Sequence, residues 1–303
     1  MQGRVGPSLL SFHWGGRVIA VAMLMGLLAA LGWGAADYLA GSTAKLVGIR
    51  RTALFTQSAG WLAVSLLLLA MPALREKALA ASYTGWLYGA LAVAFNLAGS
   101  VSLLRAFSIG HASLVAPLIT SYAAVTAFLG VAISGDRMSG FRLAGILVCL
   151  IGAPLAAVAP KRQDERGDAG VGYALLTAFC FGIGFWVQGK FAVPAIGVTP
   201  MLWLFFSIGI LALAPTLVLH GEAIFPSRDA LRLLLLQSVC NLVGYGTFAI
   251  GMATGAVTIV TVLSTFAAAI TAVFGLALRR ERLSRAQAVG VSAILIGAVL
   301  LAV

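Results

Sequence analysis

The sequence predicts an all-α integral membrane protein with ten transmembrane helices, arranged as two inverted five-helix repeats (5+5) around a central cavity. Three observations predict this fold class: an extreme apolar composition, ten apolar runs of helical length, and an internal repeat. Of 303 residues, 61% are hydrophobic and 10% are charged, whereas a soluble domain carries about 25% charged residues. Most of the protein surface is therefore expected to face lipid.

The apolar runs have the length of membrane-spanning helices. A helix needs about 20 apolar residues to cross about 30 Å of hydrocarbon. The runs do not alternate polar and apolar residues as the strands of a membrane β-barrel do, so their backbone must be satisfied within helices. Breaking the chain at charges, prolines and glycine clusters predicts spans over residues 18–41, 52–71, 84–104, 112–134, 141–159, 171–192, 200–219, 230–250, 256–278 and 287–303.

One long polar joint, KRQDERGDAG at residues 161–170, separates five spans from five. We therefore expect a first five-helix repeat over residues 18–159, a polar loop over 160–170 and a second, inverted repeat over 171–303. Because more spans follow the first apolar run, we interpret that run as a retained helix and not as a cleaved signal peptide.

An internal repeat relates the two halves. Shifting the second half by 145 positions places Asn96 on Asn241, and the joint Asp136-Arg-Met-Ser on Glu281-Arg-Leu-Ser. The first and sixth spans match at an offset of 148, with Gly34 on Gly182 and Tyr38 on Trp186. Further matches at 145 are Leu97/Leu242, Gly99/Gly244, Gly110/Gly255, Val115/Val260, Leu118/Leu263, Gly130/Gly275, Gly145/Gly290 and Gly152/Gly297. A shared Asn, Arg, Ser and glycine series without gaps indicates duplication.

The odd number of spans in each copy has a consequence for transport. Because five is odd, the second copy must enter the membrane in the opposite orientation. Inverted repeats of this kind place a binding site between the halves and support alternating access. The repeat therefore favours a transporter.

Two five-helix repeats, each with a (D/E)R(M/L)S joint before a glycine-rich last helix, resemble the EamA-type branch of the drug/metabolite transporter superfamily, from about Val18 to Val303. The resemblance implies a ten-helix basket with a central cavity. It also implies export of amino acids, other metabolites or drugs, with exporters of aromatic and other neutral amino acids nearest. Export of a drug or a lipid-like amphiphile, as by a flippase, is the alternative. The family has no sharp catalytic signature to transfer.

Polar residues at membrane depth are the first candidates for a substrate site. Asp37 is the only acid inside a predicted span, and a charge at that depth is costly unless it has a function; pairing with Lys45 near the helix end is the alternative. Asn96 and Asn241 are repeat mates whose amides need a partner, either a neighbouring helix or a ligand. Ser100 and Tyr245 lie one turn beyond them, so these four side chains are expected to face one cavity from two sides.

Aromatic residues of the first and sixth spans are the second group of candidates. Trp33 and Phe181 lie deeper in these spans, whereas Tyr38 and Trp186 lie near their ends, where interfacial aromatics are common. Tyr122 in the fourth span is a similar cavity candidate. Lys190 ends the sixth span, where reaching the headgroups is the usual role and binding a substrate carboxylate is the alternative.

The sequence predicts no cofactor, no metal site and no catalytic residue. Cys149, Cys180 and Cys240 lie singly in apolar runs, and neither a CxxC nor an HExxH pattern occurs. An intramembrane enzyme, a channel and a membrane scaffold are therefore the weaker alternatives. With one marginal carboxylate in the spans, we expect facilitated or weakly coupled transport.

The charge pattern bears on partners and location. The net charge is +11, and the 20 Lys and Arg residues lie mostly in short joints, which is typical of loops that fix membrane topology and not of nucleic-acid binding. Thirteen of them lie on the side opposite the N-terminus, which predicts an external N-terminus, whereas the family resemblance implies cytoplasmic termini. We expect a multi-pass protein of the bacterial inner membrane, a monomer or homodimer, whose partners are a small-molecule substrate and membrane lipid.

Overall fold

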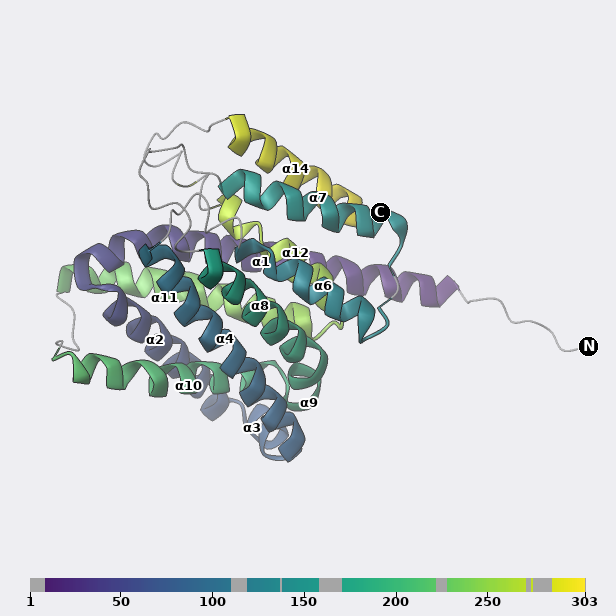
Figure 1. The fold of residues 1–303 in the computed structure, drawn as a ribbon. Helices are drawn as coiled ribbons and strands as arrows, with labels where there is room; N and C mark the ends of the chain where they lie inside the picture. Colours follow the sequence, from purple (N-terminus) through teal and green to yellow (C-terminus); the bar gives the residue numbers. More distant parts are fainter. Residues whose placement is uncertain are drawn as a thin grey trace, which may run out of the picture.

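The computed structural model describes residues 9–109, 119–136, 138–157, 171–221, 228–270, 274 and 285–302. Every regular element in this part of the chain is a helix (Figure 1). The first half contains α1 (Leu9–Val47), α2 (Ile49–Ala70), α3 (Pro72–Leu79), α4 (Tyr83–Ile109), α6 (Tyr122–Ala132) and α7 (Gly140–Ala157). The second half contains α8 (Val171–Val187), the π-helix η1 (Gln188–Ala192), α9 (Val193–Ile196), α10 (Val198–Leu219), α11 (Arg228–Met252), α12 (Val257–Ser264) and α14 (Arg285–Ala302).

The long helices coincide with the predicted spans. Six of them are long and apolar enough to cross a membrane: they lie at Gly16–Leu39, Arg50–Ala70, Tyr83–Leu103, Gly172–Ile196, Val198–Leu219 and Ala230–Met252. Shorter apolar helices at Tyr122–Ala132, Leu143–Gly152 and Val257–Ile270 fall within three further predicted spans. With 39 residues, α1 is about 60 Å long, so it extends well beyond the predicted 18–41. The short helix α3 between the second and third spans was not predicted.

The main helix contacts join helices of one half to helices of the other half. The first helix of each half packs on the third-span helix of the other half, α1 on α11 and α8 on α4. Equivalent last helices α7 and α14 pack on each other, as do the equivalent second helices α2 and α10. In Figure 1, α7 begins at the end of the molecule where α14 finishes at the C-terminus, so these two helices run antiparallel.

Individual contacts repeat as well. A Cβ atom at Gly34 of α1 would lie 2.8 Å from the Cβ of Ile270 and 3.0 Å from the carbonyl oxygen of Ala267. At its mate Gly182 of α8, the same atom would meet the Cβ of Val125 and lie 2.9 Å from the carbonyl oxygen of Tyr122. Val125 and Tyr122 are the residues 145 positions before Ile270 and Ala267. The sequence repeat is therefore also a repeat of helix–helix contacts.

A left-handed glycine separates the first and second spans of each half. Gly48, between α1 and α2, has φ +87°, and Gly197, between α9 and α10, has φ +88°. Residues with a side chain rarely adopt this backbone conformation, so glycine is the residue that fits. The helices that follow, α2 and α10, each contain 22 residues, which indicates that both halves turn at equivalent points.

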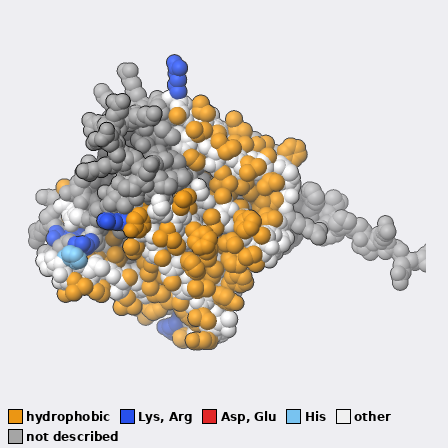
Figure 2. Space-filling view, viewed as in Figure 1, with side chains coloured by type: hydrophobic (Ala, Val, Ile, Leu, Met, Phe, Trp, Pro, Cys, Tyr) orange, Lys and Arg blue, Asp and Glu red, His pale blue; other side chains and the backbone are white. Residues whose placement is uncertain are grey.

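The outer surface is apolar. Figure 2 shows one face that is mostly hydrophobic, with the visible Lys and Arg side chains near its margins. Large side chains such as Leu31, Leu66, Phe128 and Leu211 are exposed on the helices. A soluble protein rarely leaves so much apolar surface in water. This surface and the long apolar helices identify a multi-pass integral membrane protein.

Candidate functional site

Six aromatic side chains from four helices meet at the centre of the packing, where the two halves join. We call them the aromatic cluster: Trp33 on α1, Tyr122 on α6, Phe181 and Phe185 on α8, and Tyr245 and Phe248 on α11. Phe185 is the hub, because its ring lies 4.8 Å from Phe248, 5.3 Å from Tyr122 and 6.3 Å from Trp33 between ring centroids. Edge-to-face and offset contacts of this kind stabilise aromatic groups beyond the burial of their area.

The cluster is held in place by close helix approach on both sides. A Cβ atom at Gly244 would lie 2.5 Å from Cδ1 of Trp33, and a Cβ atom at Gly99 would lie 2.5 Å from Cδ1 of Phe181. Trp33 and Phe181 are repeat mates, and so are Gly244 and Gly99. Each half therefore contributes one aromatic ring seated on a glycine of the other half. The Nε1 edge of Trp33 faces Gly244 and has no hydrogen-bond acceptor among the described residues.

Asp37 lies beside the aromatic cluster. It is one helical turn after Trp33, which puts both side chains on one face of α1. The side chain is exposed, and its carboxylate is close enough to interact electrostatically with the hydroxyl groups of Tyr122 and Tyr245. Those two tyrosines belong to opposite halves. The exposed Asp37 side chain therefore lies between the halves. Among the residues that the structure describes, none forms an ion pair with it.

The position equivalent to Asp37 in the second half is closed. Phe185, the repeat mate of Asp37, is 7% exposed and packed within the aromatic cluster. Asn96 is 3% exposed, and its Nδ2 donates a hydrogen bond of 3.4 Å to Oε1 of Gln188. Its mate Asn241 is half-buried. Equivalent positions thus differ: Asp37 and Asn241 are more accessible than their mates Phe185 and Asn96.

The four side chains expected to face one cavity lie in two groups. Asn96 and Ser100 are on α4 next to α8, where the Ser100 hydroxyl donates to the Asn96 carbonyl oxygen at 2.8 Å. Asn241 and Tyr245 are on α11, where Tyr245 packs on Trp33 and on Phe205 of α10. In the described part of the chain, no hydrogen bond or ring contact joins the two groups. Tyr245 and Trp33 are the pair that lies together with Asp37.

Polar contacts join the halves at one end of the molecule. Lys190 of η1 forms an ion pair of 2.6 Å with Asp136, which follows α6, and both side chains are about one-fifth exposed. One turn earlier, Nε1 of Trp186 donates to the Ser134 hydroxyl at 3.0 Å. Next to Asp136 lies a cavity of about 190 Å³ that Thr258 also lines. We call the pairs Lys190–Asp136 and Trp186–Ser134 the cross-half latch.

The π-helix η1 has a local cause in the sequence. Pro194 has no N–H group and its ring displaces the carbonyl four residues earlier, which belongs to Lys190. The helix widens over Gln188–Ala192 instead of breaking. π-Helical turns are rare and occur often at functional sites. Here the widened turn carries Lys190 to Asp136, whereas the sequence suggested that Lys190 reaches the headgroups.

Two further polar contacts cross between the halves near the aromatic cluster. The hydroxyl groups of Tyr122 and Ser264 share a hydrogen bond of 3.1 Å, which joins α6 to α12. The Thr126 hydroxyl donates to the Gly182 carbonyl oxygen at 3.0 Å and joins α6 to α8. The ring of Tyr38 lies 6.0 Å from that of Phe274 between ring centroids.

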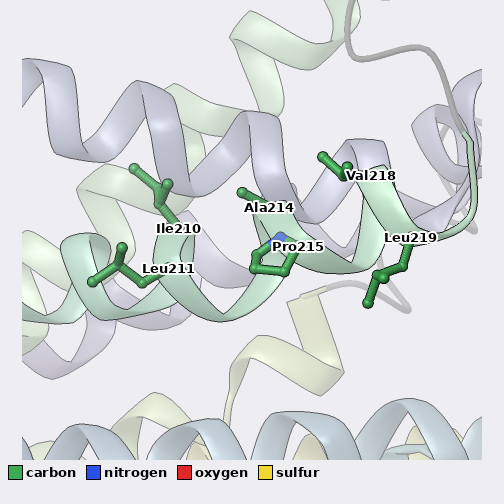
Figure 3. Close-up of a pocket in the computed structure, with 6 residues that line it drawn as sticks. All are labelled: Ile210, Leu211, Ala214, Pro215, Val218 and Leu219. Carbon is green, nitrogen blue, oxygen red and sulfur yellow. The ribbon is translucent and has the colours of Figure 1, made fainter.

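A hollow on the described surface lies away from these residues. It measures about 440 Å³ and follows the outer side of α10 around Pro215, where Leu211, Val218 and Leu219 are strongly exposed (Figure 3). Every lining side chain is apolar and comes from the one helix. Such a surface offers nothing to orient a polar substrate, and it suits the acyl chains of lipid.

Several residues of this region were missed by the sequence reasoning. Phe185, Phe248 and Asp136 were not proposed as site residues. The helical spacing from Phe181 to Phe185 and from Tyr245 to Phe248 was the available signal, because residues three or four apart share a face. No local signal pairs Asp136 with Lys190, since these residues are 54 positions apart. The described residues contain no group of three or more His, Cys, Asp or Glu that could hold a metal ion.

Comparisons with known proteins support the division of the chain into two equivalent halves. A sequence profile of the EamA-like transporter family matches residues 20–158 and again residues 168–303. A solved crystal structure with 19% sequence identity superposes with a TM-score of 0.75, covering 93% of this chain and 96% of the other. None of the curated protein sequences matches this chain.

Proposed function

Because the chain belongs to the EamA-like transporter family, we propose that it exports small metabolites, neutral and aromatic amino acids among them, by alternating access between two inverted repeats. One observation carries the proposal: repeat-equivalent positions differ in accessibility. Asp37 is exposed between the halves, whereas its mate Phe185 is buried. A difference in accessibility between equivalent positions of the two copies is what a carrier with its site open to one side requires.

The cross-half latch supplies the closed end in this account. Its ion pair and hydrogen bond join the segment after α6 to η1 and α8, so separating the halves at that end must break both. Both side chains of the ion pair are mostly buried, with 19% and 24% exposed, so separating them requires that water or substrate replace the lost partner.

The substrate body is assigned to the aromatic cluster. Trp33 and Tyr245 are half-buried beside Asp37, so they offer apolar contact next to a charged group. Ligand sites are typically mostly apolar with a few polar groups that set orientation. An aromatic or branched aliphatic amino acid has this combination of groups.

The test is counterflow with purified protein in liposomes. Vesicles are loaded with one unlabelled compound, and uptake of its labelled form is followed for a panel of amino acids and amphipathic drugs. A carrier gives saturable uptake that the internal compound accelerates above that of protein-free vesicles. Flux that neither saturates nor responds to internal compound identifies a channel, and no flux for any compound contradicts the proposal.

A further inference from the structure

The charge balance at the membrane centre points to the part of the substrate that is recognised. Within the six long spans, Asp37 is the only acidic residue of the sequence. The basic residues of these spans are Arg17, Arg50, Arg51 and Arg232, which lie within the first three residues of their spans, and Lys190. Lys190 is bound to Asp136 at 2.6 Å. The accessible site therefore carries one negative charge that the described residues do not neutralise.

An uncompensated carboxylate in such a place favours a cationic ligand. Removing a charge from water costs several kcal/mol unless a partner of opposite charge replaces the water. When a ligand covers Asp37, that partner must come with the ligand. A ligand carboxylate would approach Asp37 as a like charge, whereas an ammonium group would form a charge-assisted hydrogen bond.

The neighbouring rings point the same way. Trp33 precedes Asp37 by one turn and packs against Tyr245 at 5.1 Å between ring centroids. Tyr122 and Tyr245 are the two hydroxyl-bearing rings on which the Asp37 charge acts. The faces of aromatic rings attract cations, and aromatic cages are a common way to bind ammonium groups.

We propose that the Asp37 carboxylate, together with Trp33 and Tyr245, binds the positively charged ammonium group of the substrate, so that amines and zwitterions with an apolar body are carried and a substrate carboxylate is dispensable. This inference rests on the proposed transport function and specifies its substrate class. Neutral amino acids fit it through their ammonium group. Organic acids of the same size do not.

The experiment compares compounds that share a body and differ in charge. Three apolar groups are used: indole, phenyl and octyl. Each group is tested as a primary amine, as an α-amino acid and as a carboxylic acid without an amino group. Binding to the detergent-solubilised full-length protein is measured by thermal shift, and transport by counterflow in liposomes. For each apolar body that binds, we expect the amine to bind at least as tightly as the amino acid. The carboxylic acid should bind at least tenfold more weakly than the amine.

Variants assign the preference to the carboxylate. Asp37→Asn removes the charge and keeps the shape, so it should weaken amine binding tenfold or more and abolish the preference for amine over acid. Asp37→Glu should retain the preference. Glu76→Gln makes the same chemical change on α3, outside the site, and should change neither binding nor preference. Size-exclusion profiles of all three variants should match the parent, which separates loss of binding from loss of folding.

The possible outcomes separate the inference from the function on which it rests. Acids that bind or move as well as amines overturn the inference and leave transport intact. An amine preference that survives Asp37→Asn also overturns it. Binding with the expected preference but without flux supports the inference and contradicts transport. Absence of both binding and flux for every compound contradicts both.

Discussion

At the residue scale, the two halves differ most at the position of Asp37 and Phe185. The repeat places these two residues at equivalent points of α1 and α8, yet one is an exposed carboxylate and the other the buried hub of the aromatic cluster. Duplication explains the shared backbone positions, and divergence of a single side chain gives the site its charge. In the proposed site, the charged group therefore belongs to one half and its buried equivalent to the other.

The sequence predicted a functional role for single side chains where placing them in the membrane costs free energy. Asp37 stood out because a charge within an apolar span is costly, and Trp33 stood out because it lies deep beside Gly34. Phe185 did not, because a Phe in an apolar run is ordinary whether it fills the core or lines a site. The Lys190–Asp136 pair was beyond the sequence too, since it depends on the π-helical turn and on how the halves pack.

Tyr122 gives a prediction at the residue scale. Tyr122→Phe removes the hydrogen bond with Ser264, one of the polar contacts between the halves. Because the Ser264 hydroxyl also donates to the Thr261 carbonyl oxygen at 2.7 Å, it is not left without a partner. We expect the free energy of unfolding in detergent to fall by about 0.5–1.5 kcal/mol.

The control is a tyrosine of the same half that lacks such a contact. Tyr83 is 83% exposed at the start of α4, and Tyr83→Phe should leave the unfolding curve unchanged. Equal losses in the two variants would mean that the Tyr122 hydroxyl has no role in joining α6 to α12.

At the scale of elements, glycines set the distance between the halves. A Cβ atom at Gly32 of α1 would lie 2.6 Å from the backbone nitrogen of Gly244 on α11, so the two backbones are nearly in contact. Small residues allow this approach in membranes, where packing replaces the hydrophobic effect between helices. The glycine series of the sequence predicted close packing, but it did not identify which helices meet.

Two alanine substitutions on α11 test this account. At Gly244 a methyl group would meet the Trp33 ring at 2.5 Å, so Gly244→Ala should destabilise the protein by about 1–3 kcal/mol through overpacking. Gly246, two residues further, has nothing within 4 Å of that position. Gly246→Ala should be neutral or stabilise the helix by about 0.5–1 kcal/mol. SDS titration measures both, and equal effects would contradict close packing at Gly244.

At the scale of the whole molecule, the arrangement of helices was predictable to a large extent. Run length predicted the long helices, and the offsets of 145 and 148 residues predicted which of them are equivalent, because both follow from the thickness of the bilayer and from duplication. The exchange of packing partners, α1 with α11 and α8 with α4, was not predictable. Hydropathy specifies that a helix spans the membrane and carries little information about its neighbours.

The proposed opposite insertion of the halves gives a prediction about topology. The polar segment at residues 160–170 follows five predicted spans and the C-terminus follows ten, so the two points should lie on opposite sides of the membrane. Reporter fusions at residue 165 and at the C-terminus should therefore give opposite signals, and the C-terminal fusion also decides the orientation. Fusions that report the same side would mean that the halves are not inverted.

The most direct measurement for the central account is flux through a protein whose cross-half latch is covalently closed. Cys149, Cys180 and Cys240 are first replaced by alanine, and cysteines are then introduced by Asp136→Cys and Lys190→Cys. A bifunctional, reducible thiol reagent joins the two positions, and each single-cysteine variant serves as control. If access alternates by opening at this end, counterflow falls to the level of protein-free vesicles on cross-linking, ligand binding persists, and reduction restores flux. Unchanged flux through the cross-linked protein would contradict alternating access between the two halves.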